Sequence, residues 1–183
     1  MPAILQGLRR LVRLFEQESI PYMLIGGYAL AAYGQVRATM DIDVAIAAKF
    51  PKILEIQNKL RKAGFSLPSV AQDEAPMFFV VDPVNAFEVE IWTKPDGVIF
   101  DDQLLRRRVT VPLNDFQVFA IGPEDFIVNK LARKDRGTQD EMDIISVLRR
   151  QDGRLDYTYL RMRAKRVNVL ALLETLLEKS KAV

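Results

Sequence analysis

The amino-acid sequence contains no cysteine and no histidine. Their absence excludes disulfide bonds, thiolate chemistry, zinc sites built from nitrogen and sulfur ligands, and Ser-His or Cys-His catalytic triads. Any bound metal ion must therefore be held by oxygen atoms. An excess of one charge is also lacking, because 26 Lys and Arg residues stand against 24 Asp and Glu residues, for a net charge of +2. A nucleic acid or a membrane surface would need a local patch to bind this protein.

Long hydrophobic runs are missing as well. The longest uncharged apolar stretch covers residues 23–34 and contains three glycines, whereas a membrane-spanning helix needs about 20 apolar residues. Near the N-terminus, Arg9, Arg10 and Arg13 interrupt the apolar residues, and no apolar core with a cleavage site follows. We therefore expect no membrane span and no secretory signal, and we expect a cytoplasmic protein.

What the sequence does contain predicts a mixed globular fold. Its 183 residues, 49% hydrophobic and 27% charged, suffice for one sizeable core and a small appendage. A predicted hairpin between residues 77–81 and 87–92 makes the sheet mixed rather than purely parallel. The predicted elements are helix 5–15, strand 22–25, helix 28–33, strand 41–47, helix 50–63, strands 77–81 and 87–92, two short strands within 109–121, and helices 124–133, 139–150, 157–166 and 169–179.

Two pairs of acidic residues lie on predicted strands. Asp41 and Asp43 are separated by one residue, so both side chains leave the same face of a strand about 7 Å apart. Glu88 and Glu90 repeat this spacing on the strand that follows the hairpin turn. Carboxylates that converge from neighbouring strands repel one another unless a cation neutralises them, and Mg²⁺ or Mn²⁺ prefers such oxygen ligands. The alternative for an isolated D-x-D is a solvated strand end or a turn.

A glycine pair precedes the first acidic pair. Gly26 and Gly27 lie between a predicted strand and a predicted helix. Backbone N–H groups at such a junction are suited to binding phosphate, and the alternative is an ordinary tight turn. The order strand, Gly-Gly, helix, D-x-D, strand, E-x-E favours the phosphate-binding interpretation.

The segment LIGGYALAAYGQVRATMDIDVAI resembles the signature of the DNA polymerase β-like nucleotidyltransferase superfamily, in its minimal branch. That signature has a Gly-Gly pair, a D-x-D motif and a later single acid on a strand. Gly26, Gly27, Asp41 and Asp43 match it, and Glu90 corresponds to the later acid, where the family more often has Asp.

A narrower resemblance is to the nucleotidyltransferase toxins of abortive-infection systems (AbiEii-type), through the R-x-T-x-D-I-D form that begins at Arg37 and includes Thr39. Those proteins also carry a helical Lys and a later R-x-K-D-x-x-D-I motif. The counterparts here are Lys130 and the segment from Arg136 to Ile144, which includes Asp140 and Asp143 and has Gln139 in place of the second Lys.

The resemblance implies an α/β (α+β) nucleotidyltransferase fold, with a mixed β-sheet flanked by helices. Residues 1–121 would form the catalytic domain and residues 122–183 a C-terminal helical region. The implied activity is the Mg²⁺- or Mn²⁺-dependent transfer of a nucleoside monophosphate from a nucleoside triphosphate to an acceptor hydroxyl, with release of pyrophosphate. The acceptor would be tRNA or a protein, or in another version a small molecule. In the first version this chain would act as a toxin and would have an antitoxin-like partner.

The resemblance also assigns roles to single residues. Asp41 and Asp43 would bind the metal ions, and Glu90 would hold the ion that activates the acceptor hydroxyl, with Glu88 as a weaker candidate. The residues implied for the nucleotide are Gly26, Gly27, Arg37, Thr39 and Lys130. A second hypothesis is a catalytically silent relative that binds nucleotide or serves as a regulatory, antitoxin-like protein.

Several of these residues also have ordinary structural explanations. Arg37 is equally consistent with a loop salt bridge and Lys130 with a solvated helix position, while Asp140 and Asp143 are consistent with capping a helix that starts at Thr138. Trp92 is more typical of a core residue than of a base-stacking platform. Residues 149–166 carry seven basic and two acidic side chains, a local charge of +5, which suits either a polyanion partner or a solvated helix face.

Overall fold

The structure is a computed structural model that describes residues 2–34, 41–68 and 75–181. Arg37 and Thr39 lie outside the described residues. The chain divides into two compact units. The first unit comprises segments 1–28, 39–95 and 110–120, and the second comprises segments 29–38, 96–109 and 121–183. Each unit is described by itself.

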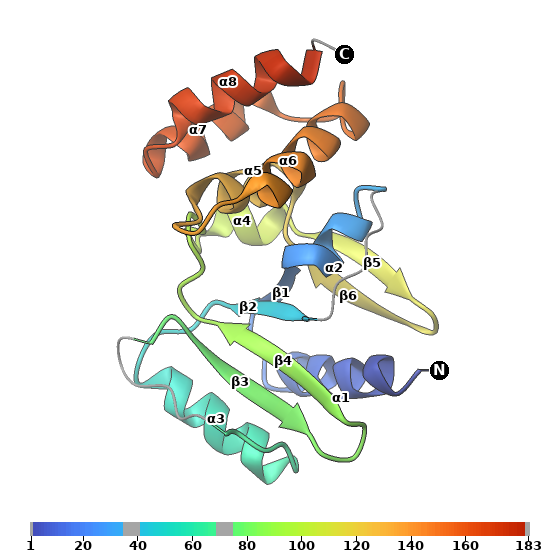
Figure 1. The fold of residues 1–183 in the computed structure, drawn as a ribbon. Helices are drawn as coiled ribbons and strands as arrows, with labels where there is room; N and C mark the ends of the chain where they lie inside the picture. Colours follow the sequence, from blue (N-terminus) through green and yellow to red (C-terminus); the bar gives the residue numbers. More distant parts are fainter. Residues whose placement is uncertain (1, 35–40, 69–74, 182–183) are drawn as a thin grey trace. The chain divides into compact units, whose positions relative to one another are not determined.

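The first unit is built on a six-stranded mixed sheet in the order β3-β4-β2-β1-β6-β5 (Figure 1). In this sheet β1 pairs antiparallel with β2 and parallel with β6, while β4 pairs parallel with β2 and antiparallel with β3. The predicted mixed sheet flanked by helices is thereby confirmed. The strands are β1 (Tyr22–Ile25), β2 (Asp43–Ile46), β3 (Met77–Asp82), β4 (Phe87–Trp92), β5 (Val109–Leu113) and β6 (Phe116–Ala120).

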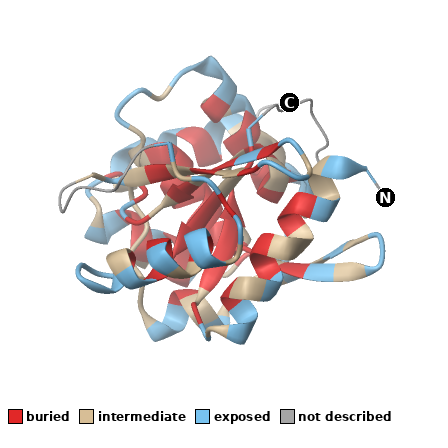
Figure 2. Cartoon of the chain, turned by 90° about the horizontal axis from the view of Figure 1, so that it is seen from below, coloured by how far each residue is buried: buried red, intermediate tan, exposed pale blue. Residues whose placement is uncertain are grey.

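The alternation of side chains along β4 explains how core and site share one strand. Phe87, Val89 and Ile91 are buried, whereas Glu88 is exposed and Glu90 is half-buried. Successive side chains of a strand point to opposite faces, so one face of β4 forms core and the other carries the acids, as the sequence predicts. Figure 2 shows the buried strands in red and the exposed outer sides of the helices in pale blue.

Helices α1 (Ala3–Gln17) and α3 (Lys52–Lys62) complete the first unit. Leu8, Leu11, Val12 and Phe15 of α1 are buried. A Cβ atom on Gly7 would lie only 2.5 Å from the Cβ of Phe87, so this helix packs tightly on β4. Arg10 connects the two helices, because its Nη2 donates a hydrogen bond of 2.9 Å to the carbonyl oxygen of Ala63 at the end of α3.

The second unit is helical. It contains α4 (Asp102–Arg106), α5 (Pro123–Ala132), α6 (Thr138–Arg150), α7 (Tyr157–Arg166) and α8 (Leu170–Lys181). Helix α5 packs on α6 and α7, and α8 packs on both α6 and α7. Pro123 begins α5 with Glu124 and Asp125 in its first turn, as predicted.

One helix is missed by the sequence analysis, and the start of another is wrong. Helix α4 is not predicted from the sequence, although Asp101 caps it by accepting a hydrogen bond of 2.9 Å from the backbone N–H of Leu104. Helix α6 is capped by Gly137 rather than by Thr138, because the chain becomes helical one residue earlier than expected. Within the described ranges, no helix has both the length and the apolar character needed to cross a membrane.

Candidate active site

The junction between β1 and α2 (Gly26–Ala31) places a glycine against an acid. Ile25 at the end of β1 is the register partner of Asp43 on β2. Gly26, the next residue, has a φ of +63°, and a Cβ atom built on it would lie 2.0 Å from Oδ2 of Asp43. The left-handed backbone conformation favours glycine, and the space of the missing Cβ is filled by the carboxylate. The predicted tight turn before the helix is corrected, since α2 begins at Gly26 itself.

The acids of the two motifs meet across parallel strands. Asp43 on β2 is the register partner of Glu90 on β4. The indole N–H of Trp92 donates to Oδ1 of Asp43 and to Oε2 of Glu90, at 3.1 Å in each case. One hydrogen-bond donor therefore connects carboxylates from two strands.

The electrostatics of this pair follow from its position. Partial burial and the nearby negative charges of Asp43 and Asp41 raise the pKa of Glu90 to about 7, although the hydrogen bond from Trp92 opposes this rise. Burial penalises the charged carboxylate, and a like charge beside it adds to the penalty. The structure thus holds two acids together at a cost that a cation would offset.

The other acids of the D-x-D and E-x-E motifs, Asp41 and Glu88, are both exposed. Asp41 is exposed and precedes β2, and its charge raises the pKa of Glu90. Glu88 is exposed two residues before Glu90, opposite Val81 of β3. Among residues 2–34, 41–68 and 75–181, no three acidic side chains are arranged so that they could hold a metal ion by themselves.

Lys130 belongs to a buried ion cluster of the second unit. Its Nζ lies 2.7 Å from Oδ1 of Asp140 and 3.4 Å from Oδ2 of Asp143. Only 2% of Lys130 is exposed, so its interpretation as a solvated helix residue is wrong. Gln139 donates a hydrogen bond of 2.9 Å to Oδ1 of Asp143, and Asp140 accepts one of 3.2 Å from the N–H of Gly137 at the start of α6.

The basic segment 149–166 is only partly a solvated face. Arg163 is fully buried and pairs with Asp125 at 2.8 Å and with Asp101 at 2.7 Å. Arg161 pairs with Glu174 on α8, and Arg166 pairs with Asp101. Three of the seven basic side chains are therefore engaged by acids of their own unit, which weakens the charge available to a polyanion.

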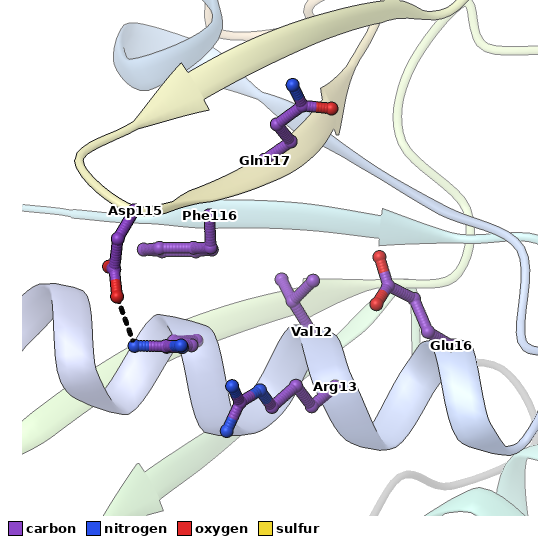
Figure 3. A pocket seen from close by; sticks show the side chains of 7 residues that line it. Val12, Arg13, Glu16, Asp115, Phe116 and Gln117 are labelled. Atoms are coloured by element: carbon purple, nitrogen blue, oxygen red, sulfur yellow. Dashed lines mark hydrogen bonds and ion pairs between the residues drawn. The ribbon is translucent and has the colours of Figure 1, made fainter.

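A hollow of about 470 Å³ lies elsewhere in the first unit, between α1 and the β5–β6 hairpin (Figure 3). It is crossed by the ion pair of Arg9 and Asp115 at 2.7 Å. Both signs of charge line it, and none of the acids from the D-x-D and E-x-E motifs does. The lining residues are Arg9, Val12, Arg13, Glu16, Asp115, Phe116 and Gln117.

Trp92 is the site residue that sequence reasoning missed. The sequence favours a core position, but the structure leaves the side chain half-buried and directs its N–H to the acids. The signal that points to this role is spacing, because a residue two positions after Glu90 on a strand lies on the same face.

Strands β2 and β4, which carry Asp43 and Glu90, are parallel neighbours in a mixed sheet beside the glycine that starts α2, and this is the nucleotidyltransferase fold expected from the sequence. The chain belongs to the family described as "Nucleotidyltransferase of unknown function (DUF6036)", whose model matches residues 4–175. No curated protein sequence gives a significant match.

Solved structures of low sequence identity share the fold. Lincosamide antibiotic adenylyltransferase LnuA, in its lincomycin-bound form, is 15% identical with a TM-score of 0.53, over 78% of this chain and 94% of that chain. The antibiotic-resistance factor ANT(2'')-Ia is 14% identical with a TM-score of 0.57, over 92% and 93%. An antigenic nucleotidyltransferase-like protein from Paracoccidioides brasiliensis is 21% identical with a TM-score of 0.54, over 92% and 88%.

Proposed function

We propose that this protein transfers a nucleoside monophosphate from a nucleoside triphosphate to an acceptor hydroxyl, and that Asp43 and Glu90 are the central residues of its site. The observation that carries the proposal is the pairing of these two acids across β2 and β4. Membership of a nucleotidyltransferase family supports the same reaction class. In this reaction the acceptor hydroxyl releases its proton to solvent and its oxygen forms a bond to the α-phosphorus. The bond from the α-phosphorus to the bridging oxygen breaks, and pyrophosphate leaves with the electron pair.

The chemistry of the acids suits a hard divalent cation. With no cysteine and no histidine in the chain, only oxygen ligands are available, as Mg²⁺ or Mn²⁺ prefers. Asp43 and Glu90 are the residues that would hold it, and Asp41 remains a predicted third ligand. The charges of Asp43 and Asp41 raise the pKa of Glu90, and a bound cation would relieve this repulsion. When bound, the cation would supply charge stabilisation at the reacting phosphate. Two neighbouring carboxylates would leave coordination positions of the cation free for water and for phosphate oxygens.

The remaining residues would bind and orient the triphosphate. We propose that the backbone N–H groups of Gly26 and Gly27 donate to its phosphate oxygens next to Asp43. It remains a prediction that the phosphate groups are also contacted by Arg37, Thr39 and Lys130. Within the second unit Lys130 already shares its charge with Asp140 and Asp143.

Two acceptor classes have support. A structure of ANT(2'')-Ia contains adenylyl-2''-tobramycin and has a TM-score of 0.54 at 10% identity, which favours a small hydroxylated molecule. The resemblance to abortive-infection toxins favours tRNA or a protein as acceptor, together with a toxin role and an antitoxin-like partner. The basic segment 149–166 adds little to this, because acids engage three of its basic side chains. Growth arrest on expression of the wild type, but not of Asp43→Asn, would support the toxin role.

The test is a transfer assay with each labelled triphosphate, Mg²⁺, and three acceptor pools: aminoglycosides and lincosamides, bulk tRNA, and cell-extract protein. We expect labelled product and pyrophosphate from one pool, and loss of both in Asp43→Asn. Asp102→Asn, at an exposed position of α4, serves as the control. Triphosphate binding without any product in all pools would instead support the catalytically silent relative.

A further inference from the structure

Trp92 is the only tryptophan in the chain, and it lies beside the proposed catalytic acids. Its indole N–H is 3.1 Å from Oδ1 of Asp43 and 3.1 Å from Oε2 of Glu90. A single N–H cannot neutralise two carboxylates, but it can fix where two of their oxygens lie. The second oxygen of each carboxylate is not used by this donor.

The sheet register explains why the indole reaches both acids. Asp43 is paired with Glu90, and Ala45 is paired with Trp92. Residues two apart on a strand share a face, so the tryptophan lies one pair further along the same face as the acids. Its partner Ala45 has only a methyl side chain, which leaves room for the large ring to lean back toward Asp43 and Glu90.

We propose that Trp92 is a positioning residue, whose indole N–H holds the carboxylates of Asp43 and Glu90 in one arrangement that is ready for a divalent cation. This inference rests on the proposed function. Removal of a group that holds metal-binding side chains in place typically weakens metal affinity by about 10- to 100-fold. The effect arises because the cation then has to order the carboxylates itself.

The test uses Mn²⁺ binding without any triphosphate, measured by calorimetry and, in the wild type, by quenching of the single tryptophan's fluorescence. Trp92→Phe keeps an aromatic ring but removes the N–H. Thr93→Val is the matched control, because it removes the hydrogen bonds that the side-chain hydroxyl of Thr93 donates to the carbonyl oxygens of Ala75 and Pro76. It does so without touching either acid, so it reports the effect of a local loss of stability alone.

We expect Trp92→Phe to weaken Mn²⁺ binding about 10- to 100-fold, whereas Thr93→Val keeps the wild-type dissociation constant. Replacement of Trp92 by benzothienylalanine, which has sulfur in place of the N–H in a ring of nearly the same shape, should weaken binding to a similar degree. Wild-type affinity in Trp92→Phe, or equal weakening in Thr93→Val, would overturn the role of Trp92. Absence of Mn²⁺ binding in the wild type would overturn the metal-dependent function itself, and this inference with it.

Discussion

Asp43 and Glu90 are register partners on neighbouring parallel strands, and one indole N–H donates to both side chains. The same register buries Val44 of β2 and Ile91 of β4, which are paired with each other on the opposite face. A slip of one residue would turn the apolar side chains out and the acids into the core. The stability of the core therefore fixes the geometry of the acids.

The first prediction distinguishes the two acids of the E-x-E motif. Glu90 is paired with Asp43 and accepts a hydrogen bond from Trp92, whereas Glu88 is exposed opposite Val81. We expect Glu90→Gln to lower kcat/KM for transfer on the order of 100-fold, and Glu88→Gln to leave it within about twofold of the wild type, because the surface substitution alters no contact with the pair. Steady-state kinetics of pyrophosphate release measures both variants. An equal loss in Glu88→Gln would show that the two acids act together.

The second prediction concerns the pH dependence of stability in metal-free buffer. The pKa of Glu90 is raised in the folded protein from its ordinary 4.5 to about 7 by burial and by the charges of Asp43 and Asp41. Its register partner from β3, Phe79, carries no charge. Between these two pH values the folded state retains a proton that the unfolded chain has lost, so the free energy of unfolding falls as the pH rises.

We expect the free energy of unfolding of the wild type to fall between pH 4.5 and pH 7 by about 1 to 2 kcal/mol more than that of Glu90→Gln. This difference is kept small because the Glu90 side chain is partly exposed to solvent. Urea unfolding with a chelator present, at half-unit steps of pH, measures the difference between the two proteins. Parallel curves for the wild type and Glu90→Gln would contradict the raised pKa. Addition of Mn²⁺ at pH 7 should restore stability to the wild type only.

Much of the first unit is predictable because its signals are local. The alternation of Phe87, Val89 and Ile91 with Glu88 and Glu90 specifies a strand with one buried face. The bounds of β1 and β4 match the predicted ranges, whereas β2 is shorter than the predicted strand 41–47. The contact of Gly26 with Asp43 is not predictable in the same way. It depends on the antiparallel pairing of β1 with β2, which brings together residues that no local pattern connects.

The polar interior of the second unit is harder to predict. Lys130 and Arg163 occupy helix positions that sequence spacing alone would assign to solvent, but both are buried with acids around them. Charges of this kind are buried only when partners arrive from other segments. Those partners, Asp140 for Lys130 and Asp101 for Arg163, become apparent only from the packing of the helices.

The third prediction tests why residue 26 is glycine. A Cβ atom there would meet Oδ2 of Asp43 at 2.0 Å, at a backbone φ of +63°. Gly153 is the matched control, since it has a φ of +73° and no atom within 4 Å of the corresponding position. Both Ala variants bear the backbone strain of about 1 kcal/mol, but only Gly26→Ala displaces the carboxylate.

We expect Gly26→Ala to reduce transfer and Mn²⁺ affinity by about tenfold or more, and Gly153→Ala to lower only the melting temperature. Calorimetric Mn²⁺ titration and thermal unfolding provide the two readouts. If both variants lose stability equally and bind Mn²⁺ as the wild type does, then the carboxylate adjusts to the added methyl group and Gly26 has no role in placing Asp43.

The fourth prediction concerns Lys130, whose side chain is buried between Asp140 and Asp143 in the second unit. Lys130→Met would remove the ammonium group that lies between two buried acids, while Arg133 stays 3.5 Å from Asp140. Removal of one partner from a buried ion pair costs about 3 to 5 kcal/mol. We expect a loss of this size in the free energy of unfolding, measured by urea denaturation at pH 7.

A second variant separates this structural role from a contact with nucleotide. Adding Asp140→Asn and Asp143→Asn to Lys130→Met removes the uncompensated charges, so part of the lost stability should return. If Lys130 acts only within the cluster, the triphosphate KM of this triple variant, measured well below its melting temperature, stays close to the wild-type value. A large rise in that KM despite restored stability would place Lys130 at the triphosphate. Wild-type stability of Lys130→Met would instead show that the cluster contributes little to folding.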